Sequence, residues 1–367
     1  MNYLKKELIL LFFLLLNIGL KAQTKNHTSF QADYFYGNLV KHNPDVAHLV
    51  KGHPSGIILS WNKETTGKNE WEERFNYPDF GISFIYQDFK NDVLGEDYGL
   101  YGHYNFYLGD RTKNKNDFSL RLGVGLAYNT NPYHKTENSK NTAFGSHISA
   151  SIYAMANYKR KITQNISAQT GLTFIHYSNG NTKAPNNGIN LLGINVGLNY
   201  DLNPAKKEYQ KHEKTIFKEP IKYNIVIRSG MNEADVINSG LYPFLTTSLY
   251  ADKRLSHLSA IQLGTDIFVS KFLKEYVKYK NSVDGENNDP NKYVRVGIMA
   301  GHELFINKLS ILTQVGVYVY DPVNFESIIY ERIGLKRYFG KTVFGTVSLK
   351  AHGARAEAVE FGIGARL

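Results

Sequence analysis

A long run of strict alternation at residues 118–128 constrains the fold more than any other feature of the chain. Its even positions are apolar and begin and end with aromatic rings, Phe118 and Tyr128, whereas its odd positions are Ser, Arg, Gly, Gly and Ala. Successive side chains of a strand point to opposite faces. One apolar face with aromatic ends and one small or polar face are typical of a transmembrane β-barrel strand. A soluble sandwich strand alternates as well, but usually over fewer residues.

The same alternation recurs through the whole chain. It predicts strands near residues 28–38, 55–62, 80–86, 100–108, 118–128, 147–158, 165–178 and 188–201, and then at 222–231, 240–251, 257–270, 292–305, 309–320, 325–338, 342–352 and 356–367. No further run of 18 apolar residues follows residue 23. Only helices and closed barrels satisfy their backbone groups in lipid. We therefore expect an all-β, antiparallel transmembrane β-barrel fold of about 16 strands, as one wide barrel or two tandem eight-stranded units.

Composition divides the chain into four segments. Residues 1–23 have a basic start and an apolar run too short to span a bilayer, which predicts a signal peptide. Residues 24–202 form the first barrel unit, and residues 203–221, rich in Lys and Glu between two prolines, form a charged linker. Residues 222–367 form a second unit or continue the first barrel. Within them, 271–290 is expected to be a long charged loop.

Charge and motifs limit the partners. The formal charge of +10 falls to about +8 once the three Lys and one Glu of residues 1–23 are removed. A basic surface suits anionic partners such as lipid phosphates, and export makes nucleic acid the poorer expectation. The chain has no cysteine, hence no disulfide. It has no phosphate loop, nucleotide fingerprint or metal-spacing cluster, so no cofactor is expected.

Three polar residues interrupt an otherwise apolar face near the end of two neighbouring strands. His176 and Ser178 are two residues apart, so they share one face and lie roughly 7 Å apart along the strand. This is the minimum for a hydroxyl nucleophile activated by a base. The even positions of strand 165–178 are apolar, and Asn190 occupies the corresponding face of the next strand. The group is therefore expected on the lipid-facing side of the barrel, at its outer rim.

The segments around these residues resemble a known family, the PagL-type lipid A 3-O-deacylases. The resemblance rests on His176-Tyr-Ser-Asn-Gly180, on Pro185-Asn-Asn-Gly188 and on the stretches 138–146 and 71–81, which resemble the longer Bacteroidetes-type members. It covers roughly residues 28–202. It implies an eight-stranded barrel in the outer membrane of a Gram-negative bacterium, acting as an ester hydrolase on the acyl chain at position 3 of lipid A in lipopolysaccharide. A homodimer is left open.

The resemblance also implies a role for each site residue. Ser178 would be the nucleophile and His176 the general base, while Asn179 and Asn186 would build or support the oxyanion hole. The family has a glutamate fourteen residues after the histidine, where this chain has Asn190. An amide can orient an imidazole but cannot stabilise imidazolium by charge.

Two other interpretations stay open. A catalytically silent outer-membrane barrel, structural or channel-forming, could retain the motif, and Asn190 favours this alternative. A secreted β-sandwich would be extracted without detergent. In the second half, His352 and Glu357 lie in a similar place near the last hairpin, but His352 shares its face with polar residues of the interior. We therefore expect no second active site there.

Overall fold

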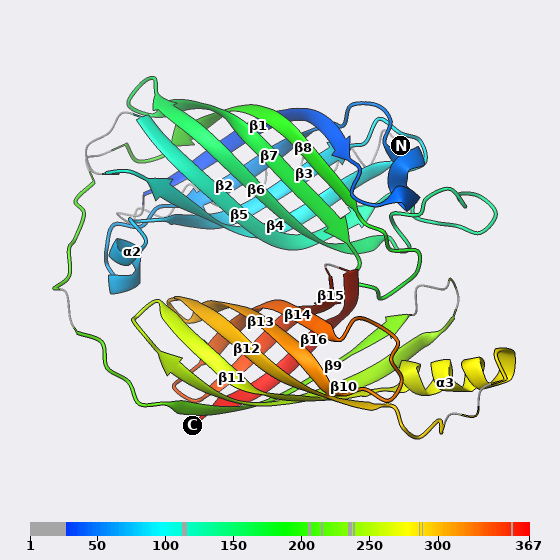
Figure 1. Cartoon of the computed structure of the whole chain (residues 1–367). Coiled ribbons are helices and arrows are strands. Elements are labelled where there is room, and N and C mark those ends of the chain that lie inside the picture. The colour runs from blue at the N-terminus through cyan, green and yellow to red at the C-terminus, as the bar shows by residue number, and fades with distance from the viewer. Residues whose placement is uncertain are drawn as a thin grey trace.

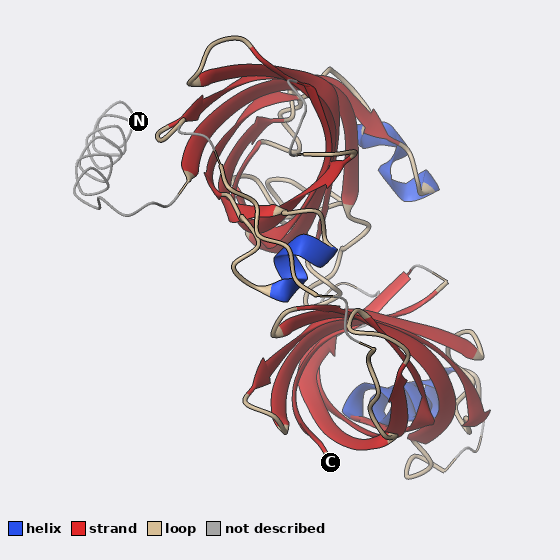
Figure 2. Cartoon of the chain, turned by 90° about the vertical axis from the view of Figure 1, so that its left-hand side faces the viewer, coloured by secondary structure: helices blue, strands red, loops and turns tan. Residues whose placement is uncertain are grey.

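The chain folds into two closed antiparallel barrels of eight strands each, which lie side by side (Figures 1 and 2). The computed structural model describes residues 27–111, 116–204, 207–213, 216–233, 237, 239–285, 287, 289–353 and 355–367. The expected signal peptide lies outside these residues. The all-β barrel prediction is confirmed, and of its two arrangements the tandem pair is the observed one.

The first barrel closes by pairing its first strand with its eighth. Its strands are β1 (Thr28–Val40), β2 (Ser55–Lys63), β3 (Asp79–Asp88), β4 (Glu96–Leu108), β5 (Asn116–Asn129), β6 (Ile148–Lys161), β7 (Ile166–Ser178) and β8 (Ile189–Asp201). The closing register runs from Ser29 opposite Asp201 to Val40 opposite Asn190. Because β1 begins and β8 ends at the same end of the barrel, Asn190 lies at the opposite end, which we call the outer end.

The second barrel repeats this architecture. Its strands are β9 (Lys222–Glu233), β10 (Leu241–Arg254), β11 (Ser259–Ser270), β12 (Val294–Ile306), β13 (Leu309–Tyr320), β14 (Ile329–Phe339), β15 (Val343–His352) and β16 (Arg355–Arg366). Strand β16 closes it on β9, from Phe361 opposite Ser229 to Arg366 opposite Asn224. The last strand therefore ends one residue before the end of the chain.

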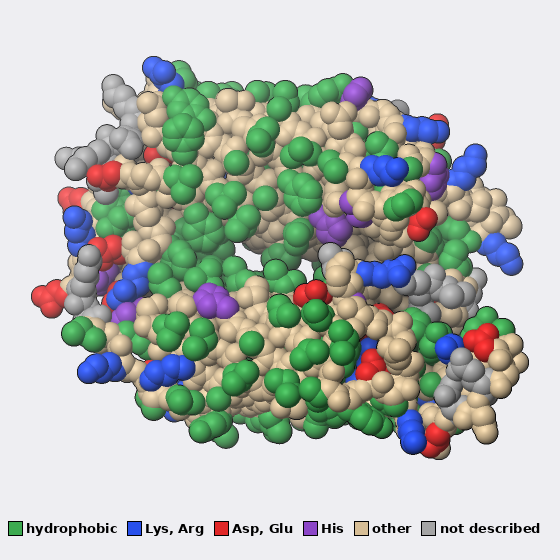
Figure 3. All heavy atoms as spheres, viewed as in Figure 1, with side chains coloured by type: hydrophobic (Ala, Val, Ile, Leu, Met, Phe, Trp, Pro, Cys, Tyr) green, Lys and Arg blue, Asp and Glu red, His purple; other side chains and the backbone are tan. Residues whose placement is uncertain are grey.

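Along each strand, side chains point alternately to the outward face of the barrel wall and to the barrel interior. In β5, Leu120, Leu122, Val124 and Leu126 are 38–62% exposed, whereas Arg121 between them is 2% exposed. Figure 3 shows apolar side chains over the visible walls of both barrels, with charged side chains gathered mainly toward the two ends. An apolar band between two charged ends is what a bilayer requires of a barrel wall.

Long polar side chains fill both interiors. In the first barrel, Arg121 donates hydrogen bonds to Asn105 (2.6 Å), Ser60 (2.8 Å) and Gln31 (2.9 Å). An eight-stranded barrel is just wide enough for side chains to fill it. In the second, fully buried ion pairs cross the interior; they join Arg332 to Asp266 (2.9 Å) and Glu360 (2.6 Å), and Lys336 to Glu303 (3.1 Å). These networks disfavour a continuous water channel.

The outer end of the first barrel is plugged by apolar side chains. Phe89, Phe144 and Tyr177 are at most 1% exposed and contact one another edge to face or tilted. Tyr177 also donates a hydrogen bond to Gln87 at 2.9 Å. Because Tyr177 points inward from β7, its neighbours His176 and Ser178 must point outward.

Short helices lie in the loops. They are a 3-10 helix at Pro44–Leu49, α2 at Glu70–Arg74 and α3 at Lys271–Val283. The expectation of a charged loop at 271–290 is therefore wrong over its first thirteen residues. Phe272, Leu273 and Val277 lie on one side of α3 and are buried, which gives a lysine-rich segment a helical packing face. In the described part of the chain no helix is long and apolar enough to cross a membrane.

The linker between the barrels follows the inner end of the first one (Figure 1, left). Its Gln210 N–H donates to Thr66 O at 2.8 Å, and His212 Nε2 lies 2.7 Å from Gly67 O. Lys207 forms an ion pair with Glu64. Burial favours the neutral acid, but Lys207 and Arg111 outweigh it and lower the pKa of Glu64 to about 2. The linker is therefore anchored on the β2–β3 segment.

Candidate active site at the outer end of the first barrel

Strands β7 and β8 carry the predicted site residues to one place. His176 and Ser178 occupy outward positions at the end of β7, and His176 is the register partner of Asn190 at the start of β8. All three are half-buried, whereas Leu172, further along the same face of β7, is 56% exposed. The expected juxtaposition of these three side chains is therefore present in the structure.

Asn190 fixes the orientation of the histidine ring. The Nδ1 atom of His176 lies 2.6 Å from Asn190 Oδ1. An amide oxygen can only accept a hydrogen bond, so Nδ1 carries the proton and Nε2 keeps its lone pair. This is the tautomer that a general base needs. Among the described residues no ion pair reaches His176, so the amide is not supplemented by a carboxylate there.

Hydrogen-bond donors surround the hydroxyl of Ser178. The Gly180 N–H and Asn186 Nδ2 each donate to Ser178 Oγ at 3.1 Å. Asn186 Oδ1 accepts the backbone N–H of Asn179 at 2.8 Å and also lies 3.2 Å from Ser178 Oγ, so both ends of this amide contact the serine. Two N–H donors therefore converge on the hydroxyl oxygen of Ser178.

Gly188 keeps open the space between the histidine and the serine. It has φ of +66°, and a Cβ placed on it would lie 2.8 Å from Tyr177 O, 3.3 Å from His176 Cε1 and 3.6 Å from Ser178 Cβ. Both side chains thus flank one point at the end of the β7–β8 loop. No hydrogen bond joins these two described side chains directly, and catalytic hydrogen bonds often tighten only when substrate binds.

Asn179 has a different role from Asn186. Its side chain donates to Lys183 O at 2.6 Å and accepts the Thr182 N–H at 3.2 Å. Its Nδ2 also lies 3.4 Å from Ser146 Oγ. The Asn179 side chain therefore shapes the loop, and only its backbone N–H reaches the Ser178–Asn186 pair.

Other asparagines hold the surrounding loops; they lie in the stretches that carry the family resemblance, but strand alternation does not predict their contacts. Asn187 donates from its backbone and its side chain to Thr142 O, both at 3.2 Å, and His42 Nε2 lies 2.9 Å from Asn187 O. Asn138 and Asn141 both donate to the carbonyls of residues 93 and 131. The outer loops are thus tied together around the candidate site by contacts far apart in sequence.

The second barrel has its own cluster of titratable groups in its interior. His352 Nδ1 lies 3.1 Å from Glu326 and 3.5 Å from Glu357, a spacing that suits metal ligands. However, Arg295 lies 2.8 Å from Glu357 and 3.3 Å from Glu326, and Lys350 also pairs with Glu357. Two cations already neutralise the carboxylates, so the cluster is an internal ion network. His352 is buried, on the interior face that strand parity predicted for it.

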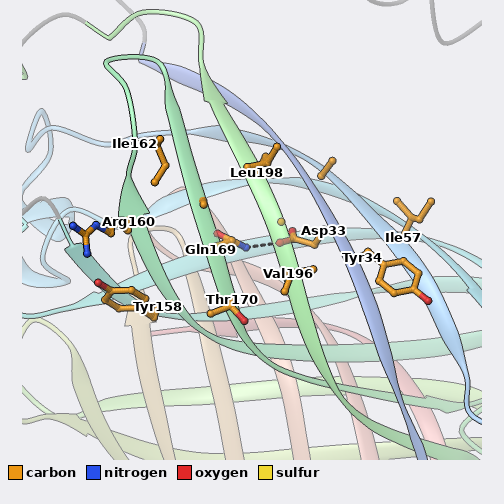
Figure 4. Close-up of a pocket in the computed structure, with 13 residues that line it drawn as sticks. Asp33, Tyr34, Ile57, Tyr158, Arg160, Ile162, Gln169, Thr170, Val196 and Leu198 are labelled. Atoms are coloured by element: carbon orange, nitrogen blue, oxygen red, sulfur yellow. Dashed lines mark hydrogen bonds between the residues drawn. The ribbon is translucent and has the colours of Figure 1, made fainter.

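A recess lies elsewhere on the first barrel. It is a shallow depression of about 800 Å³ on the outer wall of β1, β2 and β6–β8 (Figure 4). Its lining includes the small residues Ala32, Ala168 and Gly197. Behind it, Gln169 donates to Asp33 at 2.6 Å. Thr170 in its lining is six residues from His176, or roughly 20 Å along the strand. The candidate site is therefore distinct from this recess.

Two closed barrels with apolar walls define an outer-membrane β-barrel protein. Two family models match consecutive parts of the chain: lipid A 3-O-deacylase (PagL) over residues 55–199, and acyloxyacyl hydrolase, C-terminal domain, over residues 221–367. The chain belongs to this PagL-type family and to the outer membrane of a Gram-negative bacterium.

Solved structures resemble the chain at low identity. The crystal structure of the outer membrane enzyme PagL is 15% identical, with 46% of this chain and 97% of that chain covered and a TM-score of 0.32. Neisserial surface protein A (NspA) is 12% identical, with 47% and 96% covered and a TM-score of 0.29. A porin of Rh. blastica is 8% identical, with 93% and 100% covered and a TM-score of 0.18. No sequence among the curated proteins matches the chain.

Proposed function

We propose that the protein is a serine esterase that removes the ester-linked 3-hydroxyacyl chain from position 3 of lipid A in the outer membrane. Family membership supports a lipid A deacylase, and the placement of His176 and Ser178 supports the reaction type. The proposal rests mainly on one observation: His176, Ser178 and Asn190 lie together on the outward face of the barrel wall, at its outer end. A nucleophile there can reach an acyl ester near the membrane surface without the lipid leaving the bilayer.

The proposed reaction follows from the contacts of each side chain. Ser178 Oγ attacks the ester carbonyl while His176 Nε2 takes its proton, and the developing oxyanion lies near the Gly180 N–H and Asn186 Nδ2. The protonated imidazole then gives its proton to the departing sugar oxygen. His176 then takes a proton from water, which attacks the acyl-serine carbonyl; as the bond to Ser178 Oγ breaks, His176 returns the proton to that oxygen and the 3-hydroxy fatty acid leaves. Asn190 keeps Nδ1 protonated throughout.

A test uses the purified protein in detergent micelles with lipid A as substrate. Release of the 3-hydroxy fatty acid, measured by chromatography with mass detection, should be lost in Ser178→Ala. In His176→Ala it should fall by about 10²–10⁴-fold, the usual contribution of a positioned base. Ser167→Ala is the matched control, because Ser167 lies on β7 but faces the interior. Equal release by wild type and Ser178→Ala would overturn the proposal.

The second candidate is a catalytically silent barrel, and Asn190 is the observation in its favour. In serine proteases, an Asp-to-Asn change at the equivalent role costs about 10⁴-fold in rate, mainly because it selects the wrong histidine tautomer. The filled interiors disfavour the channel form of this alternative. If folded wild-type protein releases no fatty acid, the silent barrel is the better account.

A further inference from the structure

Glu233 breaks the apolar pattern of the second barrel where that barrel meets the first. It lies at the end of β9, on the outward face that Ile225, Ile227 and Met231 occupy with 43–48% exposure, yet Glu233 is only 7% exposed. A buried carboxylate is costly unless hydrogen bonds satisfy it. Its partners are in the other barrel.

Glu233 forms two hydrogen bonds with the β7–β8 loop of the first barrel. Its Oε2 accepts the Ala184 N–H at 2.7 Å, and its own N–H donates to Asn181 O at 3.0 Å. Ala184 is two residues from Asn186, and Asn181 is three residues from Ser178. Both contacts therefore act on the loop that places the candidate oxyanion donors.

An apolar contact lies beside these hydrogen bonds. A Cβ placed on Gly180 would lie 2.3 Å from Val359 Cγ2 and 3.6 Å from Leu349 Cδ1, so the two barrels touch closely there. Leu349 and Val359 are half-buried, whereas Phe361, the next residue on the same face of β16, is 62% exposed. Gly180 is the residue whose N–H donates to Ser178 Oγ. The second barrel thus abuts the serine's own hydrogen-bond donor.

We propose that the second barrel acts in cis as a scaffold for the active site of the first, with Glu233 as a positioning residue for the loop 179–187. The proposal rests on the deacylase function proposed above. The Glu233 carboxylate holds Ala184, and the Val359–Leu349 face supports Gly180. Together they keep Gly180 N–H and Asn186 Nδ2 directed at the reacting centre. The second barrel thereby contributes to the rate of the reaction at the first.

A readout independent of catalysis tests the loop contact. Trypsin cleaves after lysine, and Lys183 is exposed. The peptide bond after Lys183 contains the Ala184 N–H, which donates to Glu233 Oε2. Cleavage there requires the loop to open, and cleavage rates follow the open population. Removing the acceptor in Glu233→Ala should accelerate cleavage after Lys183 by about tenfold or more. In Glu233→Gln, whose amide oxygen can still accept, cleavage should remain slow.

The kinetic arm tests positioning. Glu233→Ala should lower kcat by about 10–100-fold with little change in KM, because a displaced loop misplaces the oxyanion donors without removing lipid contacts. Glu233→Gln should recover most of the lost rate. Glu331→Ala is the matched control, since Glu331 accepts the Gly353 N–H within the second barrel at 3.0 Å.

The two arms separate the two proposals. Slow cleavage and full kcat in Glu233→Ala would overturn the positioning role, as would a kcat for Glu331→Ala as low as that of Glu233→Ala. Absence of turnover in wild type, together with fast cleavage in Glu233→Ala, would refute the deacylase function while leaving the loop contact established.

Discussion

Asn190 decides how strong the proposed catalyst is. Its amide oxygen, 2.6 Å from His176 Nδ1, selects the right tautomer but brings no charge to balance the imidazolium that forms during attack. The described residues supply no carboxylate in its place. We therefore expect a slow enzyme, limited by the stability of protonated His176.

The change Asn190→Glu should raise kcat/KM, because a carboxylate beside Nδ1 stabilises imidazolium. An increase of about 10–100-fold is expected, because a neighbouring opposite charge shifts the equilibrium toward imidazolium by about one to two pKa units, whereas the tautomer is already correct. Fatty acid release from lipid A measures it, and Asn190→Gln controls for the added length. Equal rates in the two variants would mean that His176 is not the base or that its charge is balanced by another group.

At the residue level, strand parity predicted which side chains share a face but not which loop residues contact them. Parity placed His176, Ser178 and Asn190 on one face because their mutual position depends only on alternation and on strand pairing. It could not separate Asn186, which contacts Ser178, from Asn179, whose side chain holds the loop. Nor could it identify Glu233, because its partners Asn181 and Ala184 lie in another barrel.

At the scale of elements, the strands were predictable and the loops were not. Strands of a membrane barrel separate an apolar wall from a polar interior, so their sequence alternates. The outer loops are held by contacts such as that between Asn187 and Thr142, which no local pattern encodes. In α3 the charged residues outnumber the buried ones, so the buried positions Phe272, Leu273 and Val277 were insufficient to indicate a helix.

The turn at Gly188 ends the β7–β8 loop and should not accept a side chain. In Gly188→Ala the methyl group would enter the space between His176 and Ser178, and a positive φ costs an L-residue about 1–2 kcal/mol. We expect kcat/KM to fall by about 10–100-fold, measured by fatty acid release, with unchanged heat-modifiable gel mobility. Gly285→Ala isolates the backbone strain, since Gly285 has φ of +68° and open space around it. A rate equal to wild type in Gly188→Ala would contradict the geometry of the site.

On the scale of the whole molecule, two barrels are joined at both ends. The linker is anchored at the inner end through Lys207 and Glu64, and Glu233 joins the barrels at the outer end. Sequence alternation predicted sixteen strands but left one barrel or two open, because closure depends on pairing β1 with β8 and β9 with β16.

A cysteine pair tests the contact between the barrels, in a chain that has no cysteine of its own. A Cβ on Gly180 would lie 3.6 Å from Val359 Cβ, within the disulfide range of about 3.5–4.5 Å. Under mild oxidation, Gly180→Cys with Val359→Cys should form an intramolecular disulfide, detected by mass spectrometry of a digest. The control pairs Gly180→Cys with Ile363→Cys, about 13 Å further along the same face of β16. Equal cross-linking of both pairs, or of neither, would contradict the docked arrangement.

Lipid A from a Gram-negative host that expresses the protein gives the most direct test of the central claim. Mass spectra should show a species lighter by one 3-hydroxyacyl group in cells with wild-type protein. That species should be absent with Ser178→Ala at equal folded amounts in the outer membrane. Identical lipid A spectra from the two strains would contradict the account.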